Sequence, residues 1–221
     1  MLPSSDLLLR LRRADPDRYF CTLFAPAQMQ EPLALLYLFN HELARAREVA
    51  STPLLALIRL QWWREVVEGA DKLHELATPL AAALAAGALP RDALLALIDA
   101  RDAEDEAPLL DNARATGGCL ARTAGQVMGV DAAALEDLGT AYGIAGRLRN
   151  AALRGQAPEA AHIAEAERLL ATTPPRGAVA AWLPAVFARR DLKRLRAGRV
   201  IPVQRGAADR LAVTWAALTS R

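Results

Sequence analysis

The residues that could take part in chemistry lie on two largely apolar stretches of the chain. The first stretch, residues 32–48, carries five candidate polar side chains: Tyr37, Asn40, His41, Arg45 and Glu48. The second, residues 131–155, carries four: Arg147, Arg149, Asn150 and Arg154. Guanidinium groups bind phosphate oxygens through paired N–H donors, so the second stretch could hold a phosphate group without a metal ion.

Each of these candidates also has a structural interpretation. Arg147 and Arg154 share one helix face at a spacing of seven residues, whereas Arg149 points elsewhere, which weakens a common phosphate site. Asn40 and His41 either line an internal cavity or form a satisfied polar pair in the interior. Glu48 follows Arg45 by three residues and fits an exposed or salt-bridged position better than a metal-ligand position.

Composition defines the elements that must position these residues. The chain has 221 residues, of which 53% are hydrophobic and only 5% aromatic. Alanine and leucine dominate and alternating β-branched runs are absent, so we expect a single all-α domain over residues 1–221 with a sizeable core. We expect about eight helices and no internal repeat.

Proline and capping residues mark several helix boundaries. Pro32 suits the first turn of a helix whose run 33–39 is apolar on every side, as in the middle of a bundle. Thr52 and Pro53 form an N-cap and N1 pair, and Asp131 can cap the long helix that reaches Gly155. The stretch 172–177 is the clearest break before a final pair of helices, one of which we expect to kink at Pro184.

Positive charge is concentrated near the C-terminus. Residues 189–221 contain nine Lys or Arg against Asp191 and Asp209, a net +7, which leaves −5 for residues 1–188 because the whole chain carries +2. This basic region predicts either docking on anionic lipid or an acidic protein, or merely a solvated face. Nucleic acid is not expected, because Trp215 is the only aromatic residue in the region and no binding motif accompanies it.

Two further patterns exclude classes of protein. No window approaches the roughly 18 consecutive apolar residues of a membrane-spanning helix, so we expect a cytoplasmic protein, either free or peripheral to a membrane. Cys21 and Cys119 have apolar neighbours and no CxxC or histidine partner, which favours free thiols over a disulfide or a zinc site.

Three motifs resemble those of the squalene/phytoene synthase family. They are the segment Phe39-Asn40-His41-Glu42-Leu43-Ala44, which follows a Phe-Ala-Pro turn, the Arg-x-Gln-Trp-Trp stretch at 59–63 and the Tyr-Gly-Ile-x-x-x-Leu-Arg segment at 142–149. The pattern is closest to a short, degenerate branch related to the mitochondrial complex I assembly factor with a synthase-like fold. The resemblance covers residues 15–155 well, and a shortened basic end from about 177 onward more loosely.

The resemblance implies an isoprenoid-synthase-like helical bundle around a central cavity. Active members place two DxxxD pairs on facing helices, and these pairs hold the Mg²⁺ ions that neutralise a diphosphate leaving group. Here the first pair falls on Ala44 and Glu48, and the second on Asn150 and Arg154. We therefore expect these two pairs to face each other across an apolar cavity, with no bound metal or other cofactor.

The resemblance also names possible contacts to an isoprenoid or lipid ligand: Tyr37, Asn40, His41, Arg45, Arg147 and Arg149. Two function classes follow. The first is a pseudoenzyme, a non-catalytic binding or assembly protein that retains a prenyl-binding cavity. The second is an active, Mg²⁺-dependent prenyltransferase that condenses two isoprenoid diphosphates in carotenoid or hopanoid biosynthesis. The missing acids favour the first, and fold membership alone does not fix the function.

Overall fold

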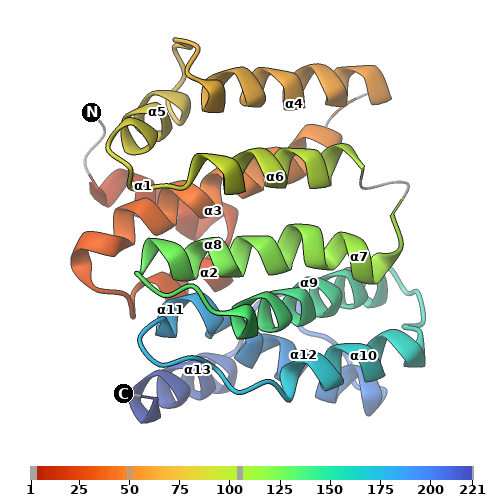
Figure 1. The fold of residues 1–221 in the computed structure, drawn as a ribbon. Coiled ribbons are helices and arrows are strands. Elements are labelled where there is room, and N and C mark those ends of the chain that lie inside the picture. The colour runs from red at the N-terminus through yellow and green to blue at the C-terminus, as the bar shows by residue number, and fades with distance from the viewer. Residues whose placement is uncertain (1–3, 49, 51, 104–106, 221) are drawn as a thin grey trace.

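The protein is an all-α bundle, seen in a computed structural model that describes residues 4–48, 50, 52–103 and 107–220 (Figure 1). The side chains of residues 4, 5, 47 and 48 lie outside this description. The elements are α1 (Ser4–Ala14), α2 (Pro16–Thr22), α3 (Ala27–Glu48), α4 (Pro53–Glu68), α5 (Ala77–Ala85), α6 (Arg91–Asp102), α7 (Leu109–Ala113), the π-helix η1 (Arg114–Gly118), α8 (Cys119–Val127), α9 (Ala133–Leu153), α10 (Ala160–Leu170), α11 (Val179–Trp182), α12 (Pro184–Arg196) and α13 (Ala207–Thr219). No strand occurs among these described residues.

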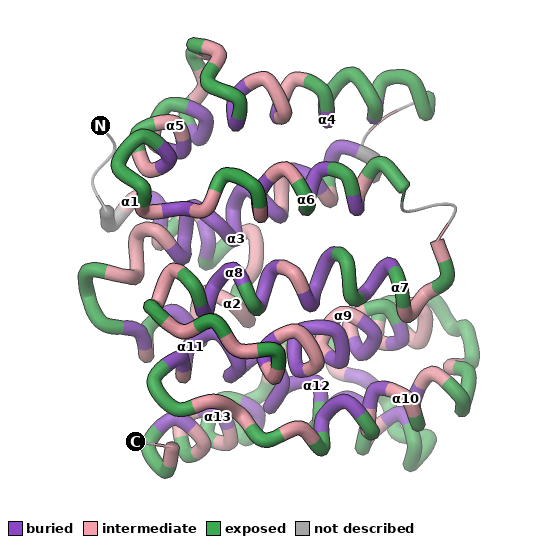
Figure 2. Tube along the Cα trace, viewed as in Figure 1, coloured by how far each residue is buried: buried purple, intermediate pink, exposed green. Residues whose placement is uncertain are grey.

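The helices lie in layers between two ends of the molecule. Figure 1 shows α4 at one end and α10, α12 and α13 at the other, with α3, α6, α8 and α9 between them. One hydrophobic core extends from Leu7 in α1 to Ala217 in α13. The run 33–40 of α3 is buried on every side, which confirms the prediction of a central helix. Figure 2 shows this buried centre, and it shows the N-terminal half of α4 as largely exposed.

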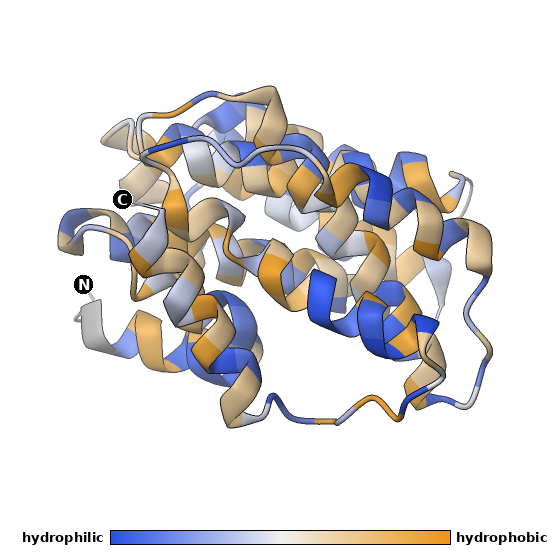
Figure 3. Ribbon diagram, turned by 90° about the horizontal axis from the view of Figure 1, so that it is seen from below, coloured by the Kyte–Doolittle hydropathy of each residue, from blue (hydrophilic) through white to orange (hydrophobic). Residues whose placement is uncertain are grey.

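Hydrophobic and hydrophilic residues occur along the same helices when the bundle is viewed from its lower end (Figure 3). This mixture is typical of helices that bury one face and expose the other. No helix in the described part of the chain is both long and apolar enough to cross a membrane. Cys21 and Cys119 are both free thiols; Cys21 is buried, as we expect for both, whereas Cys119 is only half-buried.

The predicted helix boundaries are partly wrong. Thr52 caps α4 by accepting a hydrogen bond from the Leu55 amide, with Pro53 at N1, as predicted. Pro32, however, lies inside α3, which begins five residues earlier at Ala27. Asp131 does not cap α9, because its carboxylate instead accepts hydrogen bonds from the Arg122 guanidinium. Pro184 starts α12 rather than kinking a longer helix.

Glycine residues allow η1 and α9 to touch backbone against backbone. A Cβ atom at Gly139 would lie 2.3 Å from the Gly117 carbonyl oxygen and 2.4 Å from the Ala121 Cβ. A Cβ atom at Gly117 would in turn lie 2.7 Å from the Gly139 carbonyl oxygen. Real Cβ atoms do not approach this closely, so both positions require glycine. Gly146, seven residues after Gly139 in α9, has nothing within 4 Å of an added Cβ.

We expect Gly139→Ala to lower the free energy of unfolding by about 1–3 kcal/mol, because the added methyl group overpacks the contact. The matched change in the same helix, Gly146→Ala, should leave it unchanged or raise it by up to about 1 kcal/mol, because alanine has the higher helix propensity. Urea denaturation of both variants measures the difference. Equal effects of the two substitutions would contradict the close contact.

Candidate functional site

A large cavity with a volume of about 1010 Å³ lies between α3 and α9. The rest of the lining comes from Arg12, residues 14–20, Arg101 of α6, the end of α7 with η1, Leu120 of α8 and parts of the segments 187–191 and 203–210. Pockets for small ligands commonly measure about 300–1,000 Å³. The cavity is therefore large enough for a ligand of substantial size.

Six of the sequence-predicted residues line this cavity: Asn40, His41, Ala44, Arg147, Arg149 and Asn150. Ala44 from α3 and Asn150 from α9 thus share one cavity, as the motif positions predicted. Arg154 does not join them. It is the exposed C-cap residue of α9, because the helix ends at Leu153 and the chain turns away there. The side chain of Glu48 lies outside the described residues.

Tyr37 and Arg45 also lie away from this lining. Tyr37 is buried beneath the guanidinium of Arg18, which is 5.5 Å from the ring centre. Burial raises the pKa of the Tyr37 hydroxyl, so this group stays protonated. Arg45 lines a smaller groove of about 360 Å³ on another face of the same C-terminal half of α3, together with Trp62, Trp63 and His74. The structure thus separates these two residues from the other candidates.

The expectation of an apolar cavity is wrong. Among its described lining residues are seven arginines and three aspartates: Arg12, Arg18, Arg101, Arg147, Arg149, Arg205, Arg210, Asp15, Asp17 and Asp191. Several of these side chains come from α1, α2, α6 and the C-terminal segment, which carried no motif. The lining also includes the apolar side chains of Phe20, Leu120 and Phe187.

Two arginines lie near the positions that the resemblance assigns to the acidic motifs, Arg101 on α6 and Arg147 on α9 itself. Arg101 of α6 donates to the Asn40 side-chain oxygen at 3.3 Å, one turn before Ala44. Arg147 donates to the side-chain oxygen of Asn112 and lies one turn before Asn150. Asn40 and Asn112 are 8% and 2% exposed, so both amides are held in the interior. Asn40 is therefore a bonded interior residue that also lines the cavity.

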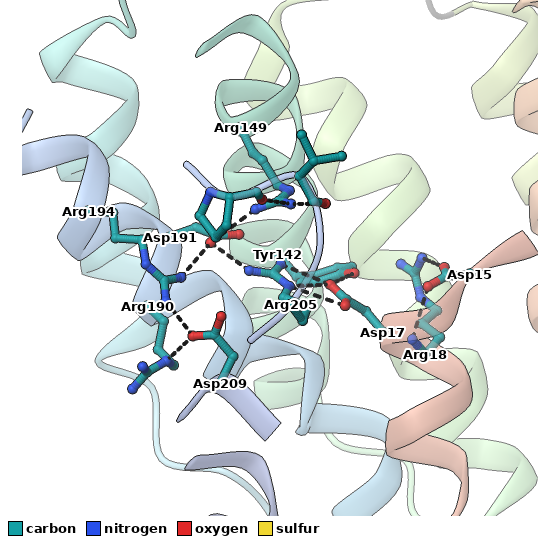
Figure 4. A network of polar contacts seen from close by, with 12 residues as sticks. Asp15, Asp17, Arg18, Tyr142, Arg149, Arg190, Asp191, Arg194, Arg205 and Asp209 are labelled. Carbon is teal, nitrogen blue, oxygen red and sulfur yellow. Dashed lines mark hydrogen bonds and ion pairs between the residues drawn. The ribbon is translucent and has the colours of Figure 1, made fainter. Parts of the chain in front are cut away.

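A network of ion pairs borders the cavity at the C-terminal segment (Figure 4). Arg205 contacts Asp17 of α2 at 2.8 Å and Asp191 of α12 at 2.6 Å. Its guanidinium also lies 4.7 Å from the centre of the Phe187 ring. Although burial alone would lower the pKa of Arg205, the two carboxylates raise it above its usual value. The Tyr142 hydroxyl donates to Asp17 at 3.3 Å.

Arg149 fixes the loop between α12 and α13. It donates to the carbonyl oxygens of Pro202 at 2.5 Å and Val203 at 2.8 Å, and lies 3.5 Å from Asp191. The loop therefore lies across one side of the cavity. Arg149 was predicted as a ligand contact, but its N–H groups are largely used to hold this loop.

The basic region near the C-terminus also contributes to the network. Arg194 contacts Asp209 at 2.6 Å, and Arg190 forms an ion pair with the same carboxylate. Burial would raise the pKa of Asp209, yet the two arginines keep it below its usual value. The α12 face that includes Arg190 and Arg194 is therefore not a simple solvated or docking face. Two of its cations hold α13 in place.

Sequence reasoning missed Asp17, Arg18, Arg101 and Arg205, because their contacts join segments that are distant along the chain. One signal was present. Asp191 and Asp209 are the only acids in a strongly basic region, and each follows or precedes arginines at helical spacing. Isolated acids in such a setting indicate internal ion pairs.

We expect Arg205→Met to lower the free energy of unfolding by roughly 3–5 kcal/mol, because it leaves buried carboxylates without their main partner. Arg196→Met is the matched control. Arg196 also contacts an acid, Glu167 at 3.2 Å, but its side chain is 72% exposed. That exposed pair should contribute no more than about 1 kcal/mol. Chemical denaturation compares the two variants, and similar losses would contradict the central role of Arg205.

Comparisons with known proteins agree with this architecture. A squalene synthase, HpnC from Alicyclobacillus acidocaldarius, superposes with a TM-score of 0.63 over 88% of this chain and 94% of that chain, at 19% identity. The rat "NADH dehydrogenase (ubiquinone) complex I, assembly factor 6" is 39% identical over 69 residues, 30% of this chain and 21% of that protein. The human protein of that name is 36% identical over 58 residues, 26% and 17% of the two chains. The chain thus matches only about a fifth of these relatives' length. The model of the "Squalene/phytoene synthase" family matches residues 11–157, more than half of the sequence, and the chain therefore belongs to that family.

Proposed function

We propose that this chain is a non-catalytic binding or assembly protein that has kept the family's cavity and lost its acidic metal-binding motifs. The observation that carries the proposal is that seven arginines but only three aspartates line the cavity. An excess of guanidinium groups in a partly enclosed space favours an anionic ligand. The proposed ligand is the diphosphate end of an isoprenoid or a related lipid, bound without a divalent metal.

The side chains at the former acidic positions do not fit a Mg²⁺–diphosphate cluster. Ala44 offers no oxygen, and Asn150 offers one neutral carbonyl where Mg²⁺ prefers carboxylates. Of the cavity acids, Asp15 pairs with Arg18 at 2.8 Å, and Asp17 and Asp191 pair with Arg205. Within the described part of the chain, no three His, Cys, Asp or Glu residues converge as a metal site would require.

The apolar part of the lining supports a lipid-like ligand. Phe20, Leu120 and Phe187 provide surface against which a hydrocarbon chain can pack. The proposed role in assembly is based on the names of the curated relatives. Their matches cover a smaller part of this chain than the family model does. The active-prenyltransferase alternative requires carboxylates that are available to a metal ion, whereas the three aspartates of the described lining are paired with arginines. This alternative is the opposite outcome of the experiments below.

We expect inorganic diphosphate and farnesyl diphosphate to bind equally well in EDTA and in Mg²⁺, measured by isothermal titration calorimetry. The double variant Arg12→Gln with Arg147→Gln should weaken binding by about tenfold or more, because it removes two charged donors from the cavity. The control Arg13→Gln with Arg154→Gln removes the same charge from α1 and from the C-cap of α9, and neither residue belongs to the lining. Equal weakening by both pairs, or binding only with Mg²⁺, would contradict the proposal.

We expect the purified protein to release no diphosphate from farnesyl or geranylgeranyl diphosphate with Mg²⁺, beyond a heat-inactivated sample. Ala44→Asp with Asn150→Asp should raise the affinity for Mg²⁺, because the two new carboxylates line the same cavity. The neutral pair Ala44→Ser with Asn150→Ser controls for the change in packing. Sustained diphosphate release by the unaltered chain would establish the prenyltransferase alternative.

A further inference from the structure

The outer face of α13 is an apolar stripe that no part of the described chain covers. Leu211, Trp215 and Leu218 follow one another at helical spacings of four and three residues, which places them on one face. They are 68%, 70% and 57% exposed. The opposite face of the helix, with Val213 and Ala217, is buried. α13 therefore satisfies the bundle with one side and leaves large apolar groups on the other.

The exposed charged side chains of the C-terminal segment, residues 177–220, carry one sign of charge. Residues 177–220 contain two acids, Asp191 and Asp209, and each is only 1% exposed. The exposed charged side chains of this segment are all basic: Arg189, Lys193, Arg196, Arg199 and Arg210. Burial of the two acids thus leaves only cations among the exposed charges of this segment, with Arg210 next to Leu211 on α13 and Arg199 next to the exposed Val200 in the loop before it.

This combination selects among the possible occupants. A second copy of the same face is disfavoured, because it would bring like charges together. A bilayer with anionic lipids offers both an apolar layer and negative charge, and tryptophan and leucine beside arginine are typical of helices that lie in its interface. The loop before α13 adds Val200 and Val203, which are 90% and 79% exposed. We propose that α13 and this loop dock on the surface of an anionic phospholipid bilayer, with Leu211, Trp215 and Leu218 inserted.

Docking in this way would bring the cavity to the membrane. Arg210 on α13 and Val203 in the loop line the cavity as well as belonging to the basic, apolar surface. The cavity would therefore open beside the lipid headgroups, where a lipid-borne anion could enter. The docking itself does not rest on the proposed ligand, so the two proposals can fail separately.

The test measures cosedimentation of the full chain with vesicles of phosphatidylcholine, with and without about one third phosphatidylglycerol. We expect binding to the anionic vesicles that weakens as salt rises toward physiological levels, where the screening length falls to about 8 Å. Leu211→Ser with Trp215→Ser should lower the partition coefficient by about tenfold or more. Lys193→Gln, Arg199→Gln and Arg210→Gln together should remove most of the salt dependence.

The matched control uses the second exposed apolar patch of the molecule. Leu54 and Ile58 on α4 are 65% and 55% exposed and lie at the opposite end of the bundle (Figure 1). Leu54→Ser with Ile58→Ser should leave vesicle binding unchanged. The proposal would be overturned if the α4 pair lost as much vesicle binding as the α13 pair, or if the protein did not bind anionic vesicles. Full competition by polyglutamate, with no effect of the α13 pair, would also overturn it and would favour an acidic protein partner.

A spectroscopic arm tests insertion directly. Trp215 is the most exposed tryptophan, whereas Trp63 and Trp182 are buried. Brominated lipids should quench the fluorescence of the bound protein. Trp215→Phe keeps an aromatic side chain at the position, so it should retain sedimentation with vesicles and lose the quenching. Quenching that persists unchanged in Trp215→Phe would overturn the proposed orientation.

Discussion

The guanidinium group of Arg205 connects the two ends of the chain. It bridges a carboxylate near the N-terminus, Asp17, and one near the C-terminus, Asp191, and stacks on Phe187. A buried ion needs an opposite charge and hydrogen bonds to offset its loss of water. Arg205 meets that need for both acids at once. The position of the loop before α13, and hence the shape of the cavity wall, depends on this bridge.

The same charge balance determines what the surface of the protein presents. Each acid in the C-terminal segment is enclosed by arginines, so the exposed charged side chains of that segment are all basic. Inside the cavity, arginines likewise outnumber acids. Cationic side chains thus line the cavity in which the resemblance implied metal-binding carboxylates. Unlike a metal ion, an arginine is part of the chain and cannot dissociate.

The sequence predicted the central features of the fold because they depend on local patterns. The apolar run in α3 and the motif positions Ala44 and Asn150 are read along single helices, and both lie where the pattern indicated. The error at Arg154 arose because α9 ends at Leu153, so the side chain of the next residue no longer follows the helical spacing that the motif assumes. The character of the cavity was predicted wrongly for a different reason. Arg18, Arg101 and Arg205 reach it from segments whose proximity is created only by tertiary packing.

The contact between Gly117 and Gly139 has a consequence for how such a sequence can diverge. A side chain at either position would push the backbones of η1 and α9 apart. Close packing therefore disfavours replacement of either glycine. Ala44 and Asn150 face open space in the cavity, and packing opposes few replacements there. Substitutions can therefore accumulate at the cavity positions while the contact between η1 and α9 preserves the shape of the scaffold. The cavity lining and the scaffold are encoded at different positions, so one can diverge without the other.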